Sequence, residues 1–272
     1  MLEQINLDQA LSKTEYKRRL PVLQRRLYDL EHAVFSSQIP VAIVFEGWAA
    51  AGKGSTINVL AERLDPRGFR VAPITPPRTA ETRYPWLWRF WLKIPAQGQM
   101  VVYDTSWYRR VLIDRITKAV RKREWQDAYQ DIIEFESQLA ADGAIILKFW
   151  LHISQKEQAG RFKKLLKDKL TTWQVTDEDA AQHRAYKKYL LAVEEMLART
   201  DAPHAPWVIV EATDRYFTRV KVIETIIRAL ETRLDAQAPP RAATGPARRA
   251  PPSPGARPRR AAAKRSREGA HA

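Results

Sequence analysis

Residues 41–56 read Val41-Ala42-Ile43-Val44-Phe45-Glu46-Gly47-Trp48-Ala49-Ala50-Ala51-Gly52-Lys53-Gly54-Ser55-Thr56. The first five residues form an apolar, β-branched run that is typical of a buried strand, and an amphipathic helical pattern begins after the loop. Glycines in such a loop let successive backbone N–H groups face one anion, while the helix N-terminus and a lysine add positive charge. A G-x-x-x-x-G-K pattern between a strand and a helix therefore predicts a phosphate-binding loop.

The loop departs from the usual pattern at one position. The residue after the lysine is normally Ser or Thr, whose hydroxyl meets magnesium, whereas here it is Gly54, with Ser55 one residue later. The alternative interpretation is a turn rich in Gly and Ala that carries an exposed lysine. The flanking strand and helix favour phosphate binding, and the residues expected to bind the phosphate are Gly47, Trp48, Ala49, Ala50, Ala51, Gly52, Lys53, Gly54 and Ser55.

Residues 99–104 form a second apolar run, which ends in the carboxylate of Asp104. An acid at the carboxyl end of the strand beside a phosphate-binding loop commonly holds the magnesium ion that bridges the phosphates. We therefore expect Asp104 to be a metal ligand, with Mg²⁺ as the cofactor. Its alternative role is to cap the helix expected to begin near Ser106, and one residue can serve both purposes.

Short apolar runs alternate with longer amphipathic segments along the chain, an order typical of a parallel sheet with crossover helices. The expected strands are residues 41–45, 70–74, 100–104, 144–153 and 208–211. The expected helices are residues 15–35, 53–64, 106–119, 125–140, 155–167, 177–198 and 216–234. Right-handed crossovers and a switch point beside the first strand predict the sheet order second, third, first, fourth, fifth. The sequence thus predicts a three-layer α/β fold with the glycine-rich loop at the carboxyl edge of the sheet.

The composition limits the classes of protein to which the chain can belong. With 272 residues and 45% hydrophobic content, the chain can build one full-sized core. The absence of cysteine excludes a disulfide framework, thiol nucleophiles and cysteine-ligated metal sites. No stretch approaches the roughly 20 apolar residues that span a bilayer, and the first eight residues do not resemble a secretion signal. We therefore expect a cytoplasmic protein with no membrane partner.

The formal net charge of +15 is concentrated toward the C-terminus. Residues 236–272 carry nine Lys and Arg residues against one acidic residue, together with seven prolines. A segment with so little to bury cannot recover its ordering entropy, so residues 235–272 are predicted to be a disordered basic tail. Such a tail would bind nucleic acid, polyphosphate or acidic lipid only nonspecifically, through counterion release. The alternative is that it only keeps the protein in solution.

Several motifs, taken in order, resemble those of the family-2 polyphosphate kinases. The resemblance covers about residues 15–232, and it lies in residues 46–54, Pro77-Arg78, residues 85–91, 104–110, 148–154, 161–173 and 205–212. It implies a P-loop kinase fold with a helical lid at about residues 155–180, preceded by a helical segment at residues 1–36 and with the kinase domain at residues 37–234. It also implies Mg²⁺-dependent transfer of phosphoryl groups between inorganic polyphosphate and a nucleoside mono- or diphosphate, by a homo-oligomer.

Phosphoryl transfer needs mainly positioning and positive charge around the non-bridging oxygens. Lys53, Asp104 and Arg110 are accordingly expected to be catalytic, with Lys53 holding the transferred group and Arg110, which follows the family's Ser-Trp-Tyr run, near the same phosphates. Arg78 and Arg161, the latter in the lid, are expected to bind the phosphate chain or the nucleotide. For each arginine taken alone, a solvated surface charge is the ordinary alternative.

Two departures from the family leave other functions open. The family normally has an acid where this chain has Ala49, and an arginine where it has Thr105. Losing a metal-linked carboxylate or a charge-stabilising arginine costs on the order of 10² in rate or more. One alternative is therefore a catalytically weakened member of the fold that binds polyphosphate or nucleotide. The other is an ATP-dependent nucleotide kinase of the thymidylate-kinase type, which shares the loop and the lid.

Overall fold

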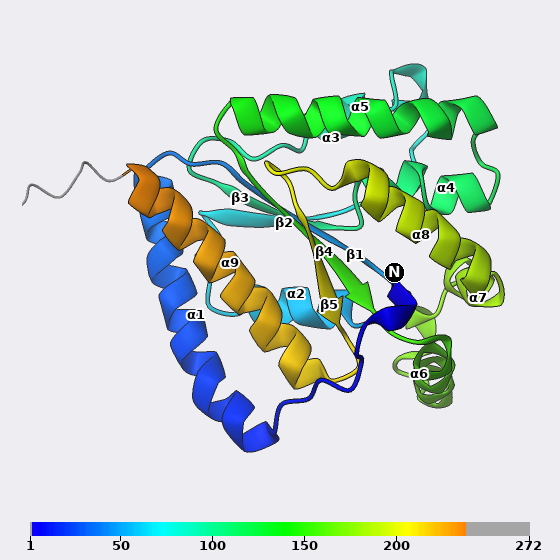
Figure 1. The fold of residues 1–272 in the computed structure, drawn as a ribbon, viewed down its shortest axis with the longest axis horizontal. Helices are drawn as coiled ribbons and strands as arrows, with labels where there is room; N and C mark the ends of the chain where they lie inside the picture. Colours follow the sequence, from blue (N-terminus) through cyan, green and yellow to red (C-terminus); the bar gives the residue numbers. More distant parts are fainter. Residues whose placement is uncertain (1, 238–272) are drawn as a thin grey trace, which may run out of the picture. The chain divides into compact units, whose positions relative to one another are not determined.

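The computed structural model describes residues 2–237, and the sheet lies at the centre of this part of the chain (Figure 1). Its five parallel strands are β1 (Val41–Gly47), β2 (Phe69–Pro73), β3 (Met100–Asp104), β4 (Ile145–His152) and β5 (Trp207–Glu211). Their order is β2-β3-β1-β4-β5, which confirms the order predicted from the sequence. All seven residues of β1 are buried, as an apolar strand covered on both faces should be.

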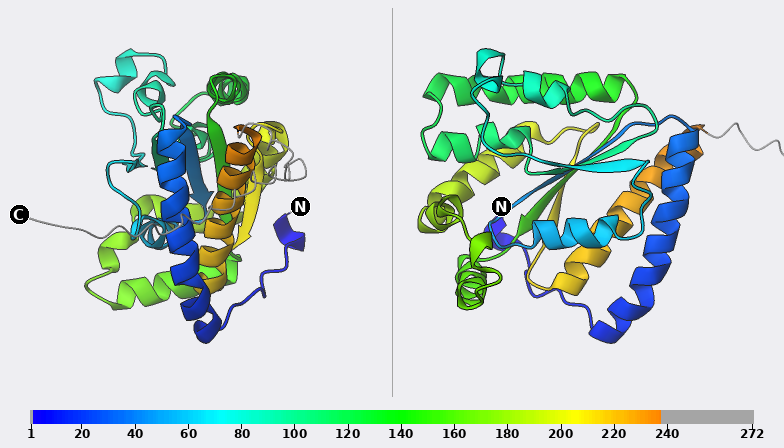
Figure 2. Two further views of the ribbon diagram at one scale, coloured as in Figure 1. Left: turned by 90° about the vertical axis from the view of Figure 1, so that its left-hand side faces the viewer. Right: turned by 180° about the vertical axis from the view of Figure 1, so that it is seen from behind.

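Helices cover both faces of the sheet and give the three layers that the sequence predicts (Figures 1 and 2). On one face lie α1 (Lys13–Ser36), α2 (Lys53–Ala61) and α9 (Arg215–Gln237), and α1 packs along α9. On the other face lie α5 (Lys122–Ala141) and α8 (Tyr186–Thr200). The core between these layers is continuous, and the described residues form one compact unit.

The remaining elements are η1 (Leu2–Gln4), η2 (Glu81–Arg83), α3 (Trp88–Trp91), η3 (Trp107–Arg110), α4 (Ile113–Ile116), α6 (Gln155–Lys167), η4 (Thr172–Gln174) and α7 (Asp177–Arg184). Most of them have only three or four residues, whereas α6 has 13 and α7 has eight. Helix α6 has the bounds expected from the sequence. Helices α6 and α7 make up the segment that corresponds to the expected lid.

Two helices that were predicted to be continuous are interrupted in the structure. Residues 106–119 form η3 and α4, because Trp107 and Tyr108 are both buried and both bond to one carboxylate, whereas adjacent side chains of an α-helix point about 100° apart. Residues 177–198 are divided at Ala185, whose φ of −99° and ψ of 22° end α7. The break lets Tyr186 stack on Trp48, with ring centroids 4.0 Å apart.

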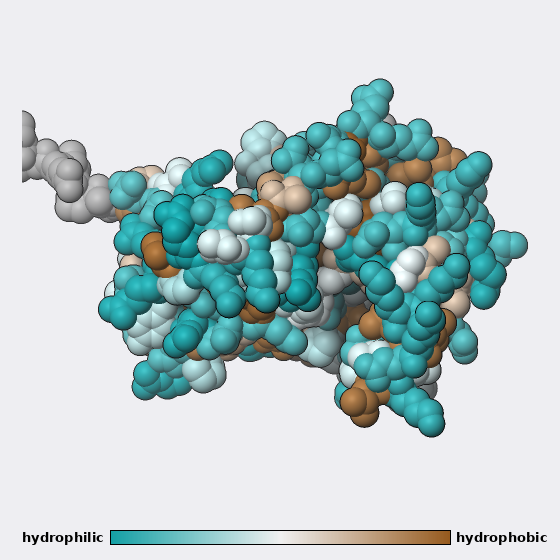
Figure 3. All heavy atoms as spheres, turned by 90° about the horizontal axis from the view of Figure 1, so that it is seen from below, coloured by the Kyte–Doolittle hydropathy of each residue, from teal (hydrophilic) through white to brown (hydrophobic). Residues whose placement is uncertain are grey.

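Within residues 2–237, no helix is long and apolar enough to cross a bilayer. The face drawn in Figure 3 is largely hydrophilic, with its apolar side chains in small separate groups. The residues after Gln237, and with them the prediction of a disordered basic tail, lie outside the described part of the chain.

A charged side chain is fully buried between the sheet and the helices α5 and α8. The ammonium of Lys148, in the middle of β4, donates to Tyr108 Oη at 2.9 Å, to Glu136 Oε2 at 2.8 Å and to the carbonyl of Thr200 at 2.7 Å. Glu136 Oε1 in turn accepts from Trp107 Nε1 at 2.9 Å and from the Tyr108 hydroxyl at 2.8 Å. Burial lowers the pKa of Lys148, and the Glu136 carboxylate opposes that shift. The three hydrogens of the ammonium are thus all used, which is what a buried charge requires.

We expect Lys148→Met to lower the free energy of unfolding by about 3–5 kcal/mol, because it leaves the Glu136 carboxylate buried without its partner. Lys148→Met combined with Glu136→Gln should recover a large part of that loss, since the amide still accepts from Trp107 and Tyr108 but carries no charge. Urea unfolding of the single and double variants measures both effects. A double variant as unstable as Lys148→Met would contradict this account of the network.

Candidate functional site

The glycine-rich loop begins where β1 ends, and its shape depends on Gly47. This residue has φ +151°, and a Cβ placed on it would lie 2.6 Å from the carbonyl oxygen of Leu151 on the neighbouring strand. Ala50 and Gly52 also have positive φ, at 59° and 95°, and Gly52 caps α2. The loop therefore curls tightly before α2 begins, as a phosphate-binding loop must.

The buried side chain of Trp48 holds the loop against the core. Its side chain is fully buried, stacks on Tyr186 and donates from Nε1 to His152 Nδ1 at 3.0 Å. Burial lowers the pKa of His152 to about 4, so the imidazole is neutral at pH 7 and can accept this bond. The Trp48 N–H donates to the Leu151 carbonyl at 3.2 Å, so Trp48 holds the loop in place with both its backbone and its indole, and its expected contact with phosphate stays a prediction.

Lys53 and Asp104 lie together at the carboxyl edge of the sheet, as the sequence predicts for a phosphate and metal site. Phe45 of β1 is paired with Asp104 of β3, and both Lys53 and Asp104 line a cleft of about 500 Å³, which we call the loop cleft. The Lys53 ammonium donates to the loop carbonyls of Gly47 at 3.1 Å and Trp48 at 3.4 Å. The other lining residues include six more of the predicted loop, namely Ala49, Ala50, Ala51, Gly52, Gly54 and Ser55. The two remaining predicted residues, Gly47 and Trp48, do not line this cleft.

The lid contacts the loop at Ala49 through neutral amides. The Ala49 N–H donates to Gln182 Oε1 of α7 at 2.7 Å, and its carbonyl accepts from Gln158 Nε2 of α6 at 3.2 Å. Gln158 Nε2 also donates to Gln182 Oε1 at 3.1 Å, and Gln158 is fully buried. Ala49 is thus enclosed by lid side chains at the position where the resemblance implies an acid.

Arg161 lines the loop cleft, but its guanidinium is committed to protein oxygens. It donates to Glu157 Oε1 at 2.7 Å, to the Ala50 carbonyl at 2.9 Å, and to the carbonyls of Ala212 and Thr213 at 2.7 and 2.8 Å. Arg161 therefore ties α6 to the loop and to the chain after β5. Its expected contact with the phosphate chain stays a prediction.

Neither Arg78 nor Arg110 lines the loop cleft or the other cavity that Lys53 lines. Arg78 is exposed in the connection after β2. Arg110 is turned toward Glu124, at 3.3 Å, and its guanidinium lies 5.6 Å from the centre of the Trp86 ring. Their expected phosphate contacts likewise stay predictions.

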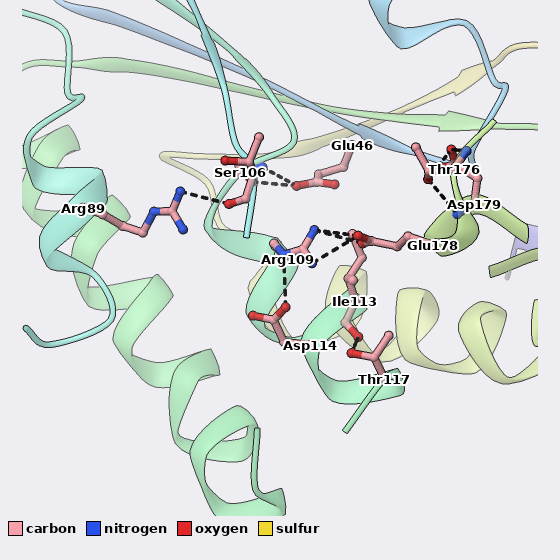
Figure 4. Close-up of polar contacts among 11 residues, drawn as sticks. Glu46, Arg89, Ser106, Arg109, Ile113, Asp114, Thr117, Thr176, Glu178 and Asp179 are labelled. Carbon is pink, nitrogen blue, oxygen red and sulfur yellow. Dashed lines mark hydrogen bonds and ion pairs between the residues drawn. The ribbon is translucent and has the colours of Figure 1, made fainter. Parts of the chain in front are cut away.

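Sequence reasoning missed Arg109, which lies closer to the loop than Arg110 does. Arg109 lines a cavity of about 200 Å³ together with Ala49 and Lys53, and we call this the inner cavity. Its guanidinium pairs with Asp114 at 3.1 Å and with Glu178 of α7 at 2.9 Å (Figure 4). The available signal was two arginines in succession after Trp107 and Tyr108. The sequence does not show which of the two arginines faces the loop.

Glu46 was also missed, although an acid at the end of a wholly apolar strand was a signal. Glu46 is buried beside the inner cavity, and its Oε1 accepts from both the N–H and the Oγ of Ser106 at 2.8 Å. Burial raises the pKa of Glu46 to about 7, against the lowering effects of Ser106 and of Lys53. The carboxyl is thus able to change protonation near neutral pH beside the loop.

The residues present fit a magnesium ion held mainly by substrate. Within residues 2–237, no three His, Cys, Asp or Glu side chains converge into a metal site. Magnesium keeps several waters and commonly takes one or two protein carboxylates plus substrate phosphates. Asp104, with Lys53 in the same cleft, provides that kind of ligand. Next to it, Thr105 has φ +63°, a strained conformation for a β-branched residue.

The raised pKa of Glu46 predicts how stability depends on pH. Between about pH 4.5 and pH 7 the folded state holds a proton that the unfolded state has lost, so the free energy of unfolding should fall as pH rises through this window. The fall should amount to about 3 kcal/mol, since one pKa unit is worth about 1.4 kcal/mol. In Glu46→Gln this fall should be absent. Urea unfolding at intervals from pH 4.5 to 8 measures it, and parallel curves for the two proteins would contradict the assignment.

Comparison with known proteins gives consistent matches over most of the chain. Residues 10–238 match the family model described as polyphosphate kinase 2 (PPK2). The polyphosphate:AMP phosphotransferase of Pseudomonas aeruginosa is 41% identical over 231 residues, which are 85% of this chain and 47% of that protein. The ADP-polyphosphate phosphotransferase of the same organism is 35% identical, over 87% of this chain and 78% of the relative.

Solved structures agree with these matches. A Pseudomonas aeruginosa structure assigned to polyphosphate kinase 2 has a TM-score of 0.84 at 40% identity, over 87% of this chain and 51% of that one. Polyphosphate kinase 2 of Arthrobacter aurescens has a TM-score of 0.81 at 26% identity, over 85% of each chain. The chain spans about half the length of the first curated relatives that it matches. Because the family model covers most of its residues, the chain belongs to the polyphosphate kinase 2 family.

Proposed function

We propose that this protein transfers a phosphoryl group between inorganic polyphosphate and a nucleoside mono- or diphosphate. The observation that carries the proposal is the placement of Lys53 and Asp104 in one cleft beside the glycine-rich loop. The names of the relatives support the substrate classes, since they are phosphotransferases that act between polyphosphate and AMP or ADP. Cytoplasmic location and a homo-oligomeric state are further proposals that rest on the sequence alone.

Each part of the site has a role in this reaction. The ammonium of Lys53 and the N–H groups of Gly54 and Ser55 in the first turn of α2 bind the non-bridging oxygens of the transferred group, and Arg109 adds positive charge from the inner cavity. Asp104 would hold Mg²⁺, which when bound would neutralise charge on the phosphates. The lid helices α6 and α7 contact the loop at Ala49 through Gln158 and Gln182, and a lid that excludes water when substrate is bound would strengthen these interactions.

A specific observation favours a second candidate function. Ala49 cannot accept a proton or coordinate a metal, and Gln158 and Gln182 occupy the space around it. The loop backbone still binds anions with any small side chain at this position. The second candidate is therefore a member of the family that binds polyphosphate or nucleotide but turns over slowly.

The transfer is tested by incubating the protein with Mg²⁺, polyphosphate and each of AMP, ADP and GDP, and quantifying the new nucleotide. Lys53→Ala should lower the rate by on the order of 10² or more, because it removes the full positive charge next to the transferred group. Lys17→Ala, an exposed lysine on α1, is the matched control and should leave the rate unchanged. Equal rates for Lys53→Ala and the starting protein would contradict the proposal.

The two candidate functions are separated by Ala49→Asp. If the missing acid limits turnover, Ala49→Asp should raise the rate, and adding Thr105→Arg should raise it further because both act on one transition state. Polyphosphate binding should change little, since the loop backbone is kept. Rapid turnover by the natural sequence, with no gain from Ala49→Asp, would show that another carboxylate has the role.

A further inference from the structure

A cavity of about 230 Å³ lies between residues 2–7 and the end of β4, and it has no role in the mechanism described above. We call residues 2–7 the N-terminal strap, which begins with η1 beside the end of β4 (Figure 1). Four of the lining residues belong to the strap, namely Leu2, Glu3, Ile5 and Leu7. The others belong to the end of β4, the start of α6 and the first turns of α8, and they are His152, Ser154, Gln155, Tyr186 and Leu190.

Both groups that hold the Trp48 indole line this cavity. Tyr186 stacks on Trp48 with ring centroids 4.0 Å apart and an angle of 14° between the rings, and its hydroxyl donates to the Ile153 carbonyl at 2.9 Å. His152 accepts from Trp48 Nε1 at 3.0 Å. The strap is therefore linked to the phosphate-binding loop through two side chains, Tyr186 and His152.

The protonation state of His152 depends on its burial. His152 is only 4% exposed, and burial lowers its pKa from 6.5 to about 4. The charged groups around it are Glu194 on α8, which opposes this shift, Glu3 on the strap, and Glu211 on β5, which is paired with Lys221. Burial is the largest of these effects, and the strap closes one side of the cavity. Water that entered this cavity would therefore bring the pKa of His152 back toward 6.5.

Only the neutral form of His152 can hold Trp48. An imidazolium has two N–H donors and no free lone pair, so it cannot accept a hydrogen bond from the indole. Protonation of His152 would thus break the bond to Trp48 Nε1, which is one of the contacts that keep the loop against the core. A loop held in its binding conformation requires a neutral imidazole.

The strap is attached mainly by two apolar side chains. Leu2 is only 1% exposed and belongs to the core, and its N–H donates to Glu194 Oε1 at 2.7 Å. Ile5 is half-buried and packs against the same core. Three other residues of the strap are exposed, namely Glu3, Gln4 and Asn6. A segment with so few buried contacts can be released at low cost in free energy while the rest of the domain stays folded.

We propose that the N-terminal strap positions the phosphate-binding loop, by keeping water away from His152 so that its imidazole can accept the hydrogen bond from Trp48. Leu2 and Ile5 are thus positioning residues, which act on a bound phosphate only through His152 and Trp48. This inference rests on the proposed function, because it takes the loop to be where the phosphate chain binds.

The first test measures the pKa of His152 by NMR titration of the full chain, with the His152 signal assigned from its loss in His152→Asn. Leu2→Asn combined with Ile5→Asn should release the strap without adding charge, and should raise the pKa of His152 from about 4 toward 6.5. Gln4→Asn combined with Gln9→Asn is the matched control at two exposed residues and should leave the pKa of His152 unchanged.

The second test measures the Kd of tripolyphosphate by calorimetry at pH 5.5 and pH 8. The ratio of the Kd of the double variant to that of the starting protein should be about tenfold larger at pH 5.5, because a histidine of pKa 6.5 is then neutral in only about one molecule in eleven. Adding His152→Asn, whose carbonyl can accept from Trp48 but does not titrate, should remove this pH dependence. Loss of packing alone would change the ratio equally at both pH values.

A His152 pKa that stays near 4 in the double variant, or a Kd ratio that is the same at pH 5.5 and pH 8, would overturn the inference. If the double variant does not fold, Leu7→Asn, at a half-buried strap residue that lines the same cavity, gives the same two measurements with smaller shifts in the same direction.

The proposed function fails in a different way. If tripolyphosphate does not bind the starting protein, or binds with the expected dependence on the strap while no nucleotide is phosphorylated, the proposed function is contradicted. The His152 titration then still decides whether the strap holds the loop. If nucleotide is phosphorylated and neither the pKa of His152 nor the Kd ratio responds to the strap, the inference is wrong and the proposed function stands.

Discussion

The positions of Arg109 and Arg110 depend on a charge buried in the core. The ammonium of Lys148 forms a buried ion pair with Glu136. The same carboxylate accepts hydrogen bonds from Trp107 and Tyr108. These hydrogen bonds fix the positions of the two aromatic side chains. They thereby also fix where the next two residues, Arg109 and Arg110, emerge from the core. In a low-dielectric interior each member of such a network depends on the others, so the network is stable only as a whole. The buried hydrogen bonds of Glu136 thus determine where the two arginines of the site lie.

Backbone strain collects where β1 and β3 end side by side. Gly47 has a conformation and a close contact that exclude a Cβ, while Ala50 and Thr105 have positive φ without being glycine. A residue such as Thr105 in the left-handed region costs on the order of 1–3 kcal/mol, and such strain is typical of functional sites. The lid meets this strained loop with the amides of Gln158 and Gln182, which hold Ala49 without adding charge. This contact uses the Ala49 N–H, so the charge on this part of the loop comes from Lys53.

Much of the fold could be predicted from the sequence, because its signals are local. The apolar runs gave all five strands to within two residues, and the switch point beside the first strand gave their order. The division at Ala185 and the short turn at residues 107–110 could not be predicted. Both follow from where aromatic side chains find partners across the fold, as Tyr186 does on Trp48. A helical period shows that a segment can be helical and does not show where tertiary contacts interrupt it.

The site, like the fold, could be predicted from the sequence only in part. Local sequence alone specifies the loop, its lysine and the acid that ends the third strand, because glycine spacing and strand periodicity are properties of adjacent residues. It does not specify that Arg109, rather than Arg110, shares a cavity with Lys53, nor that burial brings the pKa of Glu46 to about 7. Nor does it specify that Gln182, 133 residues later, accepts from the Ala49 N–H. These features depend on the burial and charge that distant segments create together, and only the folded chain brings those segments into contact.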